Sequence, residues 1–348
     1  MNIDYLDMIF STCFTLRKMK QITIQEENKN FSLRPQLHIL IISPFGTFKS
    51  SITKGLEQER SKELVLIDDF SRPGIEGSIG KDGDYIPPLL INLGGKVLVI
   101  DEWNSVDYYG QRSLLGLLEN QRVNRSIGFK VKTPFKYKSK FGYYNIIENR
   151  IQGAMLFSCI AYAMDYPIKE NSQKDKALLS RFTPLFIEPN LEYMKSHTRG
   201  EFDLNLKDYS QNVNEVVIEK ECYLEFHTLY FDYLEAKELL PHDTCDYGFI
   251  SRVMSDILRL GVYNYLSKNP TEETKVVIKD LVYFKEMFIY ASTLLNQFMN
   301  PKTKGKFDQY RTLLKKEPNK PKEYYYKVLG VSRQTLHEYD TKIKSHVK

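Results

Sequence analysis

Residues 37–50 read LHILIISPFGTFKS, and their pattern indicates the fold class of the chain. The apolar run LHILII is followed by a serine-proline pair, a glycine, a lysine and two serines. This order predicts a buried strand, then a loop, then the start of a helix. The loop matches the pattern GxxxxGK[ST] at Lys49 and Ser50, whereas Ser43 and Phe48 replace its two glycines.

A loop of this kind predicts binding of a nucleoside triphosphate. Backbone N–H groups at a helix N-terminus hold phosphate oxygens. Lys49 would reach the β and γ oxygens, and Ser50 would ligate Mg²⁺. The residues expected to contact the nucleotide are Pro44, Phe45, Gly46, Thr47, Phe48, Lys49, Ser50 and Ser51. The alternative is that the lysine and the serines cap an ordinary helix.

A second stretch, VLVIDE at 97–102, supports the nucleotide interpretation. Four apolar residues precede two carboxylates, which is the pattern of a Walker B strand. In that role Asp101 orients Mg²⁺ through its water shell, and Glu102 polarises the attacking water. The alternative is a pair of exposed acids at a strand end. Because the loop and the acid pair occur together, we predict a site for ATP and Mg²⁺ in which Ser50 and Asp101 serve the metal.

The order of the segments predicts an α/β fold. The apolar stretch AMLFSCIA at 154–161 predicts a third strand, and strands alternating with helical patterns favour a parallel sheet flanked by helices. Beyond Pro189 the strand signal fades and helical periodicity predominates. We expect an N-terminal extension at 1–30, a nucleotide-binding core at 31–190, a helical lid at 191–299, and a linker with a small DNA-binding domain at 300–348.

Motifs in this order resemble the AAA+ ATPases of the minichromosome maintenance (MCM) replicative helicase group. SPFGTFKS is similar to that family's GDPGTAKS, ALLSRF at 177–182 to its LLSRF, and the segment from Arg252 to its lid-helix pattern RxLExLIRL. The similarity runs from about Arg34 to Leu266. It implies an AAA+ P-loop NTPase core, a helical lid and a C-terminal winged-helix domain, without the family's large N-terminal domain.

The resemblance also implies roles for three side chains. Arg181 corresponds to the arginine finger, which acts on the γ-phosphate held by a neighbouring subunit. Arg252 corresponds to the sensor 2 arginine, and its alternative role is that of an exposed arginine on an amphipathic helix. Ser158 is our substitute for the sensor 1 asparagine, which AMLFSCIAYAMDYP lacks. An arginine that acts in trans implies a homo-oligomer, expected as a hexameric ring.

The segment 121–140 predicts contact with DNA, because it contains seven Lys and Arg residues and no acid. Basic and apolar residues alternate at 129–132 and 135–141, which predicts a hairpin turning at Thr133-Pro134. In the MCM resemblance a hairpin at this place grips the DNA strand. The lysines that fit this role are Lys130, Lys132, Lys136 and Lys138. Alternatively, they protect a sheet edge from aggregation.

The C-terminal segment offers a second DNA contact. Residues 301–348 hold 13 Lys and Arg against 5 Asp and Glu, and YYYKVLGVSRQTLHEY at 324–339 reads as helix, glycine turn and helix. A recognition helix there would direct Arg333, Gln334 and Thr335 toward a groove. Helix-turn-helix units also serve as protein-contact modules, which is the alternative.

Composition limits the remaining classes. The chain has 348 residues, a formal charge of +5 and 42% hydrophobic residues, which is typical of a globular protein. The four cysteines are widely spaced, which favours reduced thiols and a cytoplasmic location. No apolar run approaches the roughly 18 residues of a membrane helix, so we expect no membrane contact.

Together these features predict an ATP-dependent DNA motor, a helicase or translocase of DNA replication, from a virus, plasmid or other mobile element. Two alternatives remain open at this point. One is a replication initiator or helicase loader that uses ATP as a switch, and the other is a DNA-binding scaffold subunit that hydrolyses ATP poorly.

Overall fold

The computed structural model forms two compact units, residues 1–292 and 293–348. In the first unit it describes residues 3–26, 29–43, 49–163, 181–186, 204–209, 212–237 and 247–290. In the second unit it describes residues 310, 313–314, 318, 320–329, 333, 335–337 and 339–340.

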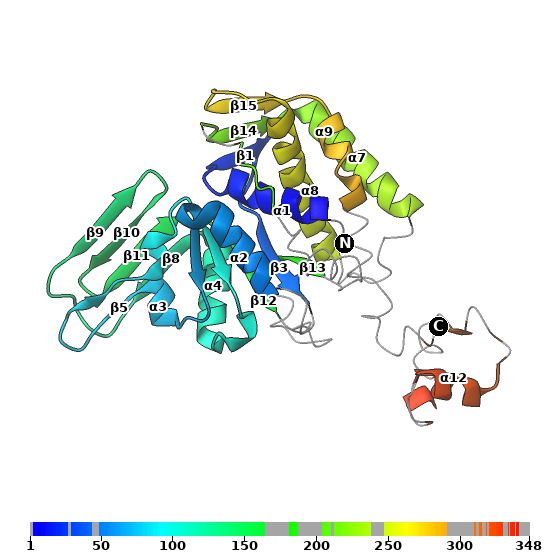
Figure 1. Cartoon of the computed structure of the whole chain (residues 1–348), viewed down its shortest axis with the longest axis horizontal. Helices are drawn as coiled ribbons and strands as arrows, with labels where there is room; N and C mark the ends of the chain where they lie inside the picture. Colours follow the sequence, from blue (N-terminus) through cyan, green and yellow to red (C-terminus); the bar gives the residue numbers. More distant parts are fainter. Residues whose placement is uncertain are drawn as a thin grey trace. The chain divides into compact units, whose positions relative to one another are not determined.

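A five-stranded parallel sheet, the core sheet, lies at the centre of the first unit (Figure 1). Its order is β13-β3-β12-β7-β4. The strands are β3 (His38–Ile42), β4 (Leu64–Ile67), β7 (Val97–Ile100), β12 (Ser158–Ala163) and β13 (Thr183–Phe186). Every residue of β3, β7 and β12 is buried, as expected for strands covered on both faces. The predicted α/β class is therefore confirmed.

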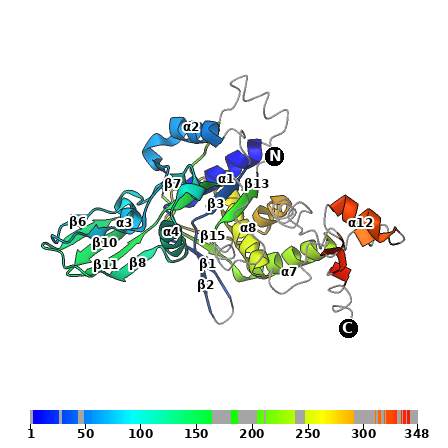
Figure 2. The ribbon, with the colours of Figure 1, turned by 90° about the horizontal axis from the view of Figure 1, so that it is seen from below.

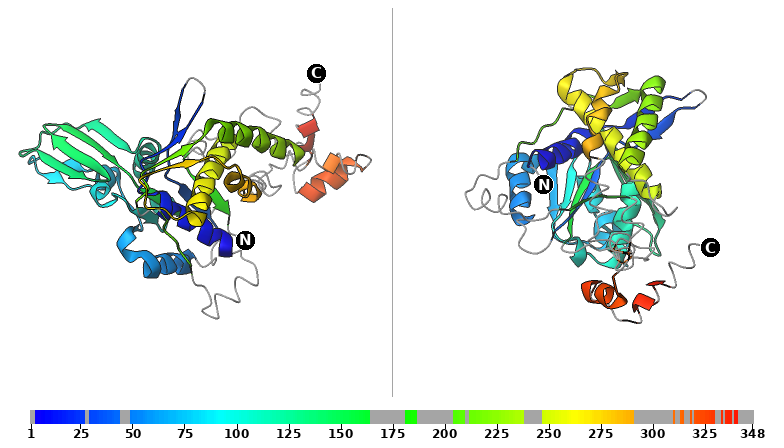
Figure 3. Two further views of the ribbon diagram at one scale, coloured as in Figure 1. Left: turned by 90° about the horizontal axis from the view of Figure 1, so that it is seen from above. Right: turned by 90° about the vertical axis from the view of Figure 1, so that its right-hand side faces the viewer.

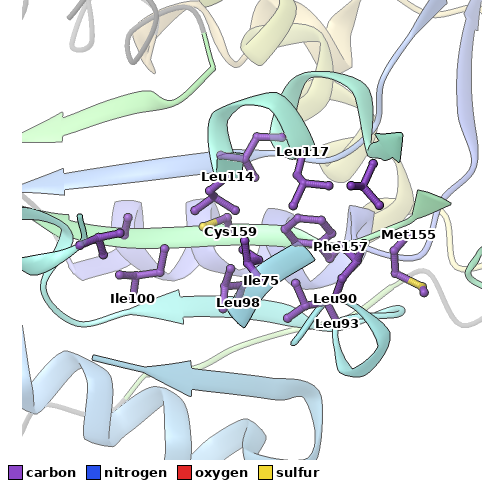
Figure 4. Close-up of a cluster of buried hydrophobic side chains, with 14 of the residues drawn as sticks. Ile75, Leu90, Leu93, Leu98, Ile100, Leu114, Leu117, Met155, Phe157 and Cys159 are labelled. Atoms are coloured by element: carbon purple, nitrogen blue, oxygen red, sulfur yellow. The ribbon is translucent and has the colours of Figure 1, made fainter. Parts of the chain in front are cut away.

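Helices cover both faces of the core sheet (Figures 2 and 3). They include α2 (Lys49–Arg60) on one face and α4 (Tyr108–Asn120) on the other. The α4 helix begins where the Asp107 carboxylate accepts a hydrogen bond from the Gly110 N–H, at 2.6 Å. Figure 4 shows Leu114 and Leu117 of this helix packed over Leu98 and Cys159 of the sheet. Short 3-10 helices are η1 (Ser61–Glu63), η2 (Leu89–Asn92) and η3 (Trp103–Ser105).

An antiparallel sheet, here called the insert sheet, is built between α4 and β12. Its strands are β8 (Arg122–Ser126), β9 (Phe135–Ser139), β10 (Gly142–Ile147) and β11 (Arg150–Met155), in the order β8-β11-β10-β9. The predicted hairpin at 129–141 is wrong in its pairing, since β9 pairs with β10 and turns at 140–141. Residues 129–132 form no strand; instead the Val131 and Lys132 N–H groups bond to the carbonyls of Glu148 and Gly83, both at 2.8 Å.

The predicted third strand at 154–161 is also wrong in its bounds. The chain changes sheets within this stretch: β11 ends the insert sheet at Met155, and β12 enters the core sheet at Ser158. The apolar pattern continues through the crossing because Phe157 is buried and Leu156 is half-buried. Periodicity detects burial, so it does not detect a change of sheet.

A small layer packs beneath the insert sheet. It consists of α3 (Arg72–Glu76) and the hairpin of β5 (Ser78–Ile79) and β6 (Tyr85–Ile86). The buried Glu76 carboxylate pairs with Arg125 of β8 at 3.1 Å and accepts a hydrogen bond from the Ser113 hydroxyl of α4. The Tyr144 hydroxyl donates to the Glu76 carbonyl at 2.7 Å. These bonds fix the insert sheet to α4 and therefore to the core sheet.

The N-terminal segment and residues 212–290 form one layered structure around a second sheet. Its order is β15-β14-β1-β2, from β1 (Gln21–Ile24), β2 (Phe31–Leu33), β14 (Glu215–Ile218) and β15 (Lys275–Ile278). The helices are α1 (Ile3–Leu16), α7 (Lys220–Ala236), α8 (Tyr247–Lys268) and α9 (Val282–Lys285). The segment beyond Pro189, where the strand signal fades, is not purely helical: β14 pairs with β1 from near the start of the chain, and β15 pairs with β14.

The first residues of the chain are also more structured than an extension would be. Arg17, which follows α1, is fully buried. Its guanidinium donates to the Gly95 carbonyl at 2.9 Å, and it pairs with Asp208 at 2.8 Å and with Glu63. With the Phe14 carbonyl this buried charge has four acceptors, and it joins the N-terminal helix to the loop before β7.

The second unit contains α12 (Lys322–Leu329) and a small core of Tyr310, Tyr325, Leu329 and Leu336. Helical backbone also occurs at Arg333 and at 335–337. Helical backbone is therefore described on both sides of the expected glycine turn, whereas residues 330–332 and 334 lie outside the described residues.

Candidate nucleotide site and nucleic-acid surface

The strand that precedes the predicted phosphate loop ends at the carboxyl edge of the core sheet. The loop residues Pro44, Phe45, Gly46, Thr47 and Phe48 lie outside the described residues. Lys49 and Ser50 form the first turn of α2, although their side chains are not described, and Ser51 is half-buried in the same turn. The strand predicted before the loop and the helix predicted after it are thus both observed.

The two predicted acids follow β7 at the same edge of the sheet. Asp101 is half-buried, and its N–H donates to the Ile67 carbonyl at 3.0 Å, which continues the β4–β7 ladder by one residue. Glu102 is exposed, and its carbonyl accepts a hydrogen bond from the Ser105 hydroxyl at 2.7 Å. The following residue, Trp103, is buried. The acid pair is therefore held between a rigid strand and an anchored turn.

A side-chain contact joins the two halves of the candidate site. The Thr53 hydroxyl of α2 donates to Asp101 Oδ1 at 3.4 Å. Residues four apart share a helix face, so Lys49 lies on the face of Thr53, about one 5.4 Å turn nearer the loop. The first turn of α2 therefore begins close to the carboxylate end of β7. A carboxylate is a ligand that Mg²⁺ prefers, and the N–H groups of a helix N-terminus bind phosphate oxygens, so the two together suit a triphosphate with its metal ion.

Two further acids at this edge escaped the sequence reasoning. Asp68 and Asp69 are exposed and follow β4, the strand beside β7. The stretch LVLIDD at 64–69 carries the same signal as VLVIDE, an apolar strand followed by two acids. Strand order separates them, because β4 is the edge strand and the α2 contact goes to Asp101. Within the described part of the chain, no cluster of three or more His, Cys, Asp or Glu residues could hold a metal alone.

The two arginines lie together at the opposite, amino edge of the core sheet. Arg181 lies two residues before β13 and forms an ion pair with Glu119 near the end of α4. Arg252 on α8 donates to the Arg181 carbonyl at 2.8 Å. A strand of four residues is about 13 Å long, so neither arginine lies beside Asp101 of its own chain. The pair is therefore separated from the candidate nucleotide site of its own chain.

The assignment of Ser158 as a sensor residue is wrong in position. Ser158 is the first residue of β12 and pairs with Val97, the first residue of β7. It therefore lies at the amino end of the strand, whereas Asp101 follows the carboxyl end. It is also fully buried. The described residues at the carboxyl end of β12 are Tyr162 and Ala163.

A buried ionic network supports the arginine edge. Asp256 of α8, which is 1% exposed, pairs with Arg259 at 2.7 Å and accepts a hydrogen bond from the Thr183 hydroxyl of β13. Burial, together with nearby Arg252, lowers the pKa of Arg259 to about 10. Burial and the nearby arginines also lower the pKa of His38 well below its usual value. This edge is thus strongly cationic and partly desolvated.

The predicted DNA-contacting residues divide among three places. Lys136 and Lys138 lie exposed on β9, as the alternation predicted. Lys130 and Lys132 are exposed outside the strands, and Lys132 pairs with Asp84 at 3.3 Å. In the second unit Arg333 is exposed and Thr335 is half-buried, while Gln334 lies outside the described residues.

No family model matches the chain, and no curated protein matches it in a sequence search. Among the described helices, none is both long enough and apolar enough to span a lipid bilayer.

Proposed function

We propose that the protein is an ATP-dependent DNA motor of the AAA+ class, an MCM-like helicase or translocase of replication that works as a ring-shaped homo-oligomer, expected as a hexamer. The observation that carries this proposal is the Thr53–Asp101 contact, which brings the first turn of α2 to the acid pair of β7. The parallel α/β core, in which the loop joins strand β3 to helix α2, is compatible with a P-loop protein.

In this proposal the residues at the carboxyl edge act in cis. Lys49 and the α2 N-terminus bind the β and γ phosphates. Ser50 and Asp101 would hold Mg²⁺, which neutralises phosphate charge when bound. Glu102, exposed at the end of β7, orients and polarises the attacking water.

The arginine pair acts in trans. Since Arg181 and Arg252 lie at the amino edge, each subunit would offer them to the nucleotide held by its neighbour. An arginine placed on a transferring phosphoryl group is worth about 10³–10⁵ in turnover. This requirement makes the oligomer a condition of activity.

Steady-state ATP hydrolysis, measured with and without single-stranded and duplex DNA, tests the proposal. We expect DNA-stimulated turnover that falls at least a hundredfold in Lys49→Ala and in Glu102→Gln. Asp69→Asn is the matched control, because Asp69 is the second acid after the neighbouring strand β4, as Glu102 is after β7. Equal loss in Asp69→Asn and Glu102→Gln would contradict the assignment of β7, and unwinding of a forked duplex distinguishes a helicase from a loader.

A second candidate is a DNA-binding subunit that binds ATP and hydrolyses it poorly. The observation that favours it is the carboxyl end of β12, where the described residues Tyr162 and Ala163 offer no asparagine. Nucleotide binding that is lost in Lys49→Ala, without turnover in the presence of DNA, would identify this case.

A further inference from the structure

The outer face of the insert sheet carries a set of side chains suited to nucleic acid. Alternate residues of the four strands face the core, where Val123, Tyr144 and Ile151 are buried. The residues between them face solvent, and they include four cations. These are Arg122, Lys136, Lys138 and Arg150. None of the outward residues of these strands is acidic, and Glu148 lies in the turn between β10 and β11.

The strand register arranges these side chains in rows. One row runs Lys138, Tyr143, Ala154 and Arg122 across the four strands, so its cations lie on the two edge strands. The next row runs Lys136, Asn145, Gln152 and Asn124. Rows on one face are about 7 Å apart and the strands about 4.8 Å apart. In these two rows positive charge lies on the edge strands β8 and β9, with amide or aromatic groups between them, and Arg150 adds a cation at the start of the central strand β11.

The central groups are those that contact bases. Tyr143 is 43% exposed on β10, so its ring face is open for stacking. Asn145 and Gln152 lie on adjacent strands, and each amide both donates and accepts hydrogen bonds. Cations alone are enough to bind a simple polyanion. Amides, in contrast, recognise the edge of a nucleic-acid base by hydrogen bonds, and a tyrosine ring stacks on the face of a base.

A pocket of about 810 Å³ adjoins the same face. Its lining includes the cations Lys20, Arg34, Arg122 and Lys140 and the amides of Gln121 and Asn124, and no lining residue is acidic. Arg122 and Asn124 belong to both the face and the pocket, so the two are continuous. The Lys140 ammonium lies 4.9 Å from the centre of the Phe141 ring, another lining residue.

We propose that the outer face of the insert sheet and the adjoining pocket bind a single strand of nucleic acid, with phosphates on the four outward cations and bases on Tyr143 and the amides of the central strands. The strand must be single because its bases reach Tyr143 and the pocket only when they are unpaired. The proposal rests on the proposed function, since it names the surface by which such a motor holds its substrate, but equilibrium binding without ATP tests it separately from hydrolysis.

The experiment measures fluorescence anisotropy of labelled 20-nucleotide DNA and RNA strands and of a DNA duplex, with full-length protein and no nucleotide. We expect single strands to bind more tightly than the duplex. Lys136→Gln with Lys138→Gln, and Arg122→Gln with Arg150→Gln, should each weaken binding at least tenfold. Each pair should also lower the slope of log affinity against log salt by about 1.4. Tyr143→Ala should weaken binding by about tenfold.

The control variants remove the same types of residue, with the same change in charge, from parts of the protein outside the insert sheet. Lys275→Gln with Lys279→Gln removes two exposed lysines from the other sheet region, and Tyr109→Ala removes an exposed tyrosine from α4; both should leave binding within twofold. Tighter binding of either DNA or RNA strands supports the proposal and assigns the natural strand. Equal effects of face and control variants, preference for duplex, or displacement of the strand by poly-glutamate at equal charge would each overturn it.

Because binding is measured without ATP, a protein that binds strands through this face but lacks turnover would refute only the proposed motor. A protein that hydrolyses ATP with DNA stimulation while the face variants bind normally would refute only the proposed surface.

Discussion

Replacement of Asp256 by alanine should destabilise the first unit strongly. Asp256 is 1% exposed and is the carboxylate that neutralises Arg259, which is itself buried with 4% of its side chain exposed. Arg252 lies 3.6 Å from the second carboxylate oxygen. Removal of one partner of a buried ion pair leaves an unpaired charge, which costs about 3–5 kcal/mol. Asp256→Ala also removes the acceptor of the Thr183 hydroxyl, so we expect the upper part of this range.

The fluorescence of Trp103 during urea unfolding measures this loss. Trp103 is the single tryptophan of the chain, it is buried, and its ring lies 5.4 Å from that of Phe182, the residue before Thr183. The signal therefore reports on the first unit alone. As a control, Asp256→Leu with Arg259→Met replaces both charges by apolar groups and should recover most of the loss. A loss below about 1 kcal/mol in Asp256→Ala, or no recovery in the double variant, would refute the argument from buried charge.

Three further predictions follow from individual residues. Gly142→Ala should destabilise the insert sheet by about 1–3 kcal/mol, because φ at Gly142 is +154° and a Cβ would lie 2.0 Å from the Ala154 carbonyl oxygen. In α4 a Cβ at Gly116 would meet nothing within 4 Å, so Gly116→Ala should stabilise the protein by up to about 1 kcal/mol. Thermal melts of the two variants test both expectations. Burial lowers the pKa of His38, so the contribution of this residue to stability is complete above the unfolded pKa of about 6.5. As the pH drops below that value, the free energy of unfolding should fall by up to about 1.4 kcal/mol per pH unit. His38→Phe should reduce that slope in urea titrations between pH 7.5 and 5.5, and an unchanged slope would contradict a neutral buried imidazole. Lys132→Gln should change stability by less than about 1 kcal/mol, since its pair with Asp84 is exposed, and a larger loss in the same melts would show that this segment does more than bridge two turns.

The sequence predicted the parts of the fold that are marked by long apolar runs with clear boundaries. The strands β3 and β7 were located because each is a buried run followed at once by the polar residues of the site. The strands β14 and β15 were missed because each has only four residues and they join a sheet with β1, which lies far away in sequence: β14 pairs with β1, and β15 pairs with β14. Ser158 was misplaced because the apolar run around it spans two sheets.

Three-dimensional pairing also determined which charged residues share a surface. Lys136 and Lys138 could be assigned to one strand face from alternation alone. Their neighbours Tyr143, Gln152 and Arg122 come from three other strands, and only the register brings them into line. The repeated acid pattern at 64–69 shows the same limit, since strand order rather than sequence distinguishes Asp101 from Asp68.

Mixing two inactive variants tests whether the ATPase site is shared between neighbouring subunits. Lys49→Ala removes the cis lysine and Arg181→Ala removes the trans arginine, so each variant alone should lack ATP hydrolysis. In mixed oligomers an intact Lys49 of one subunit meets an intact Arg181 of its neighbour at some interfaces. We predict that mixing restores DNA-stimulated turnover to a fraction that depends on the ratio of the two proteins. If the mixture stays as inactive as its components while both bind each other and DNA, the claim of an interfacial ATPase is contradicted.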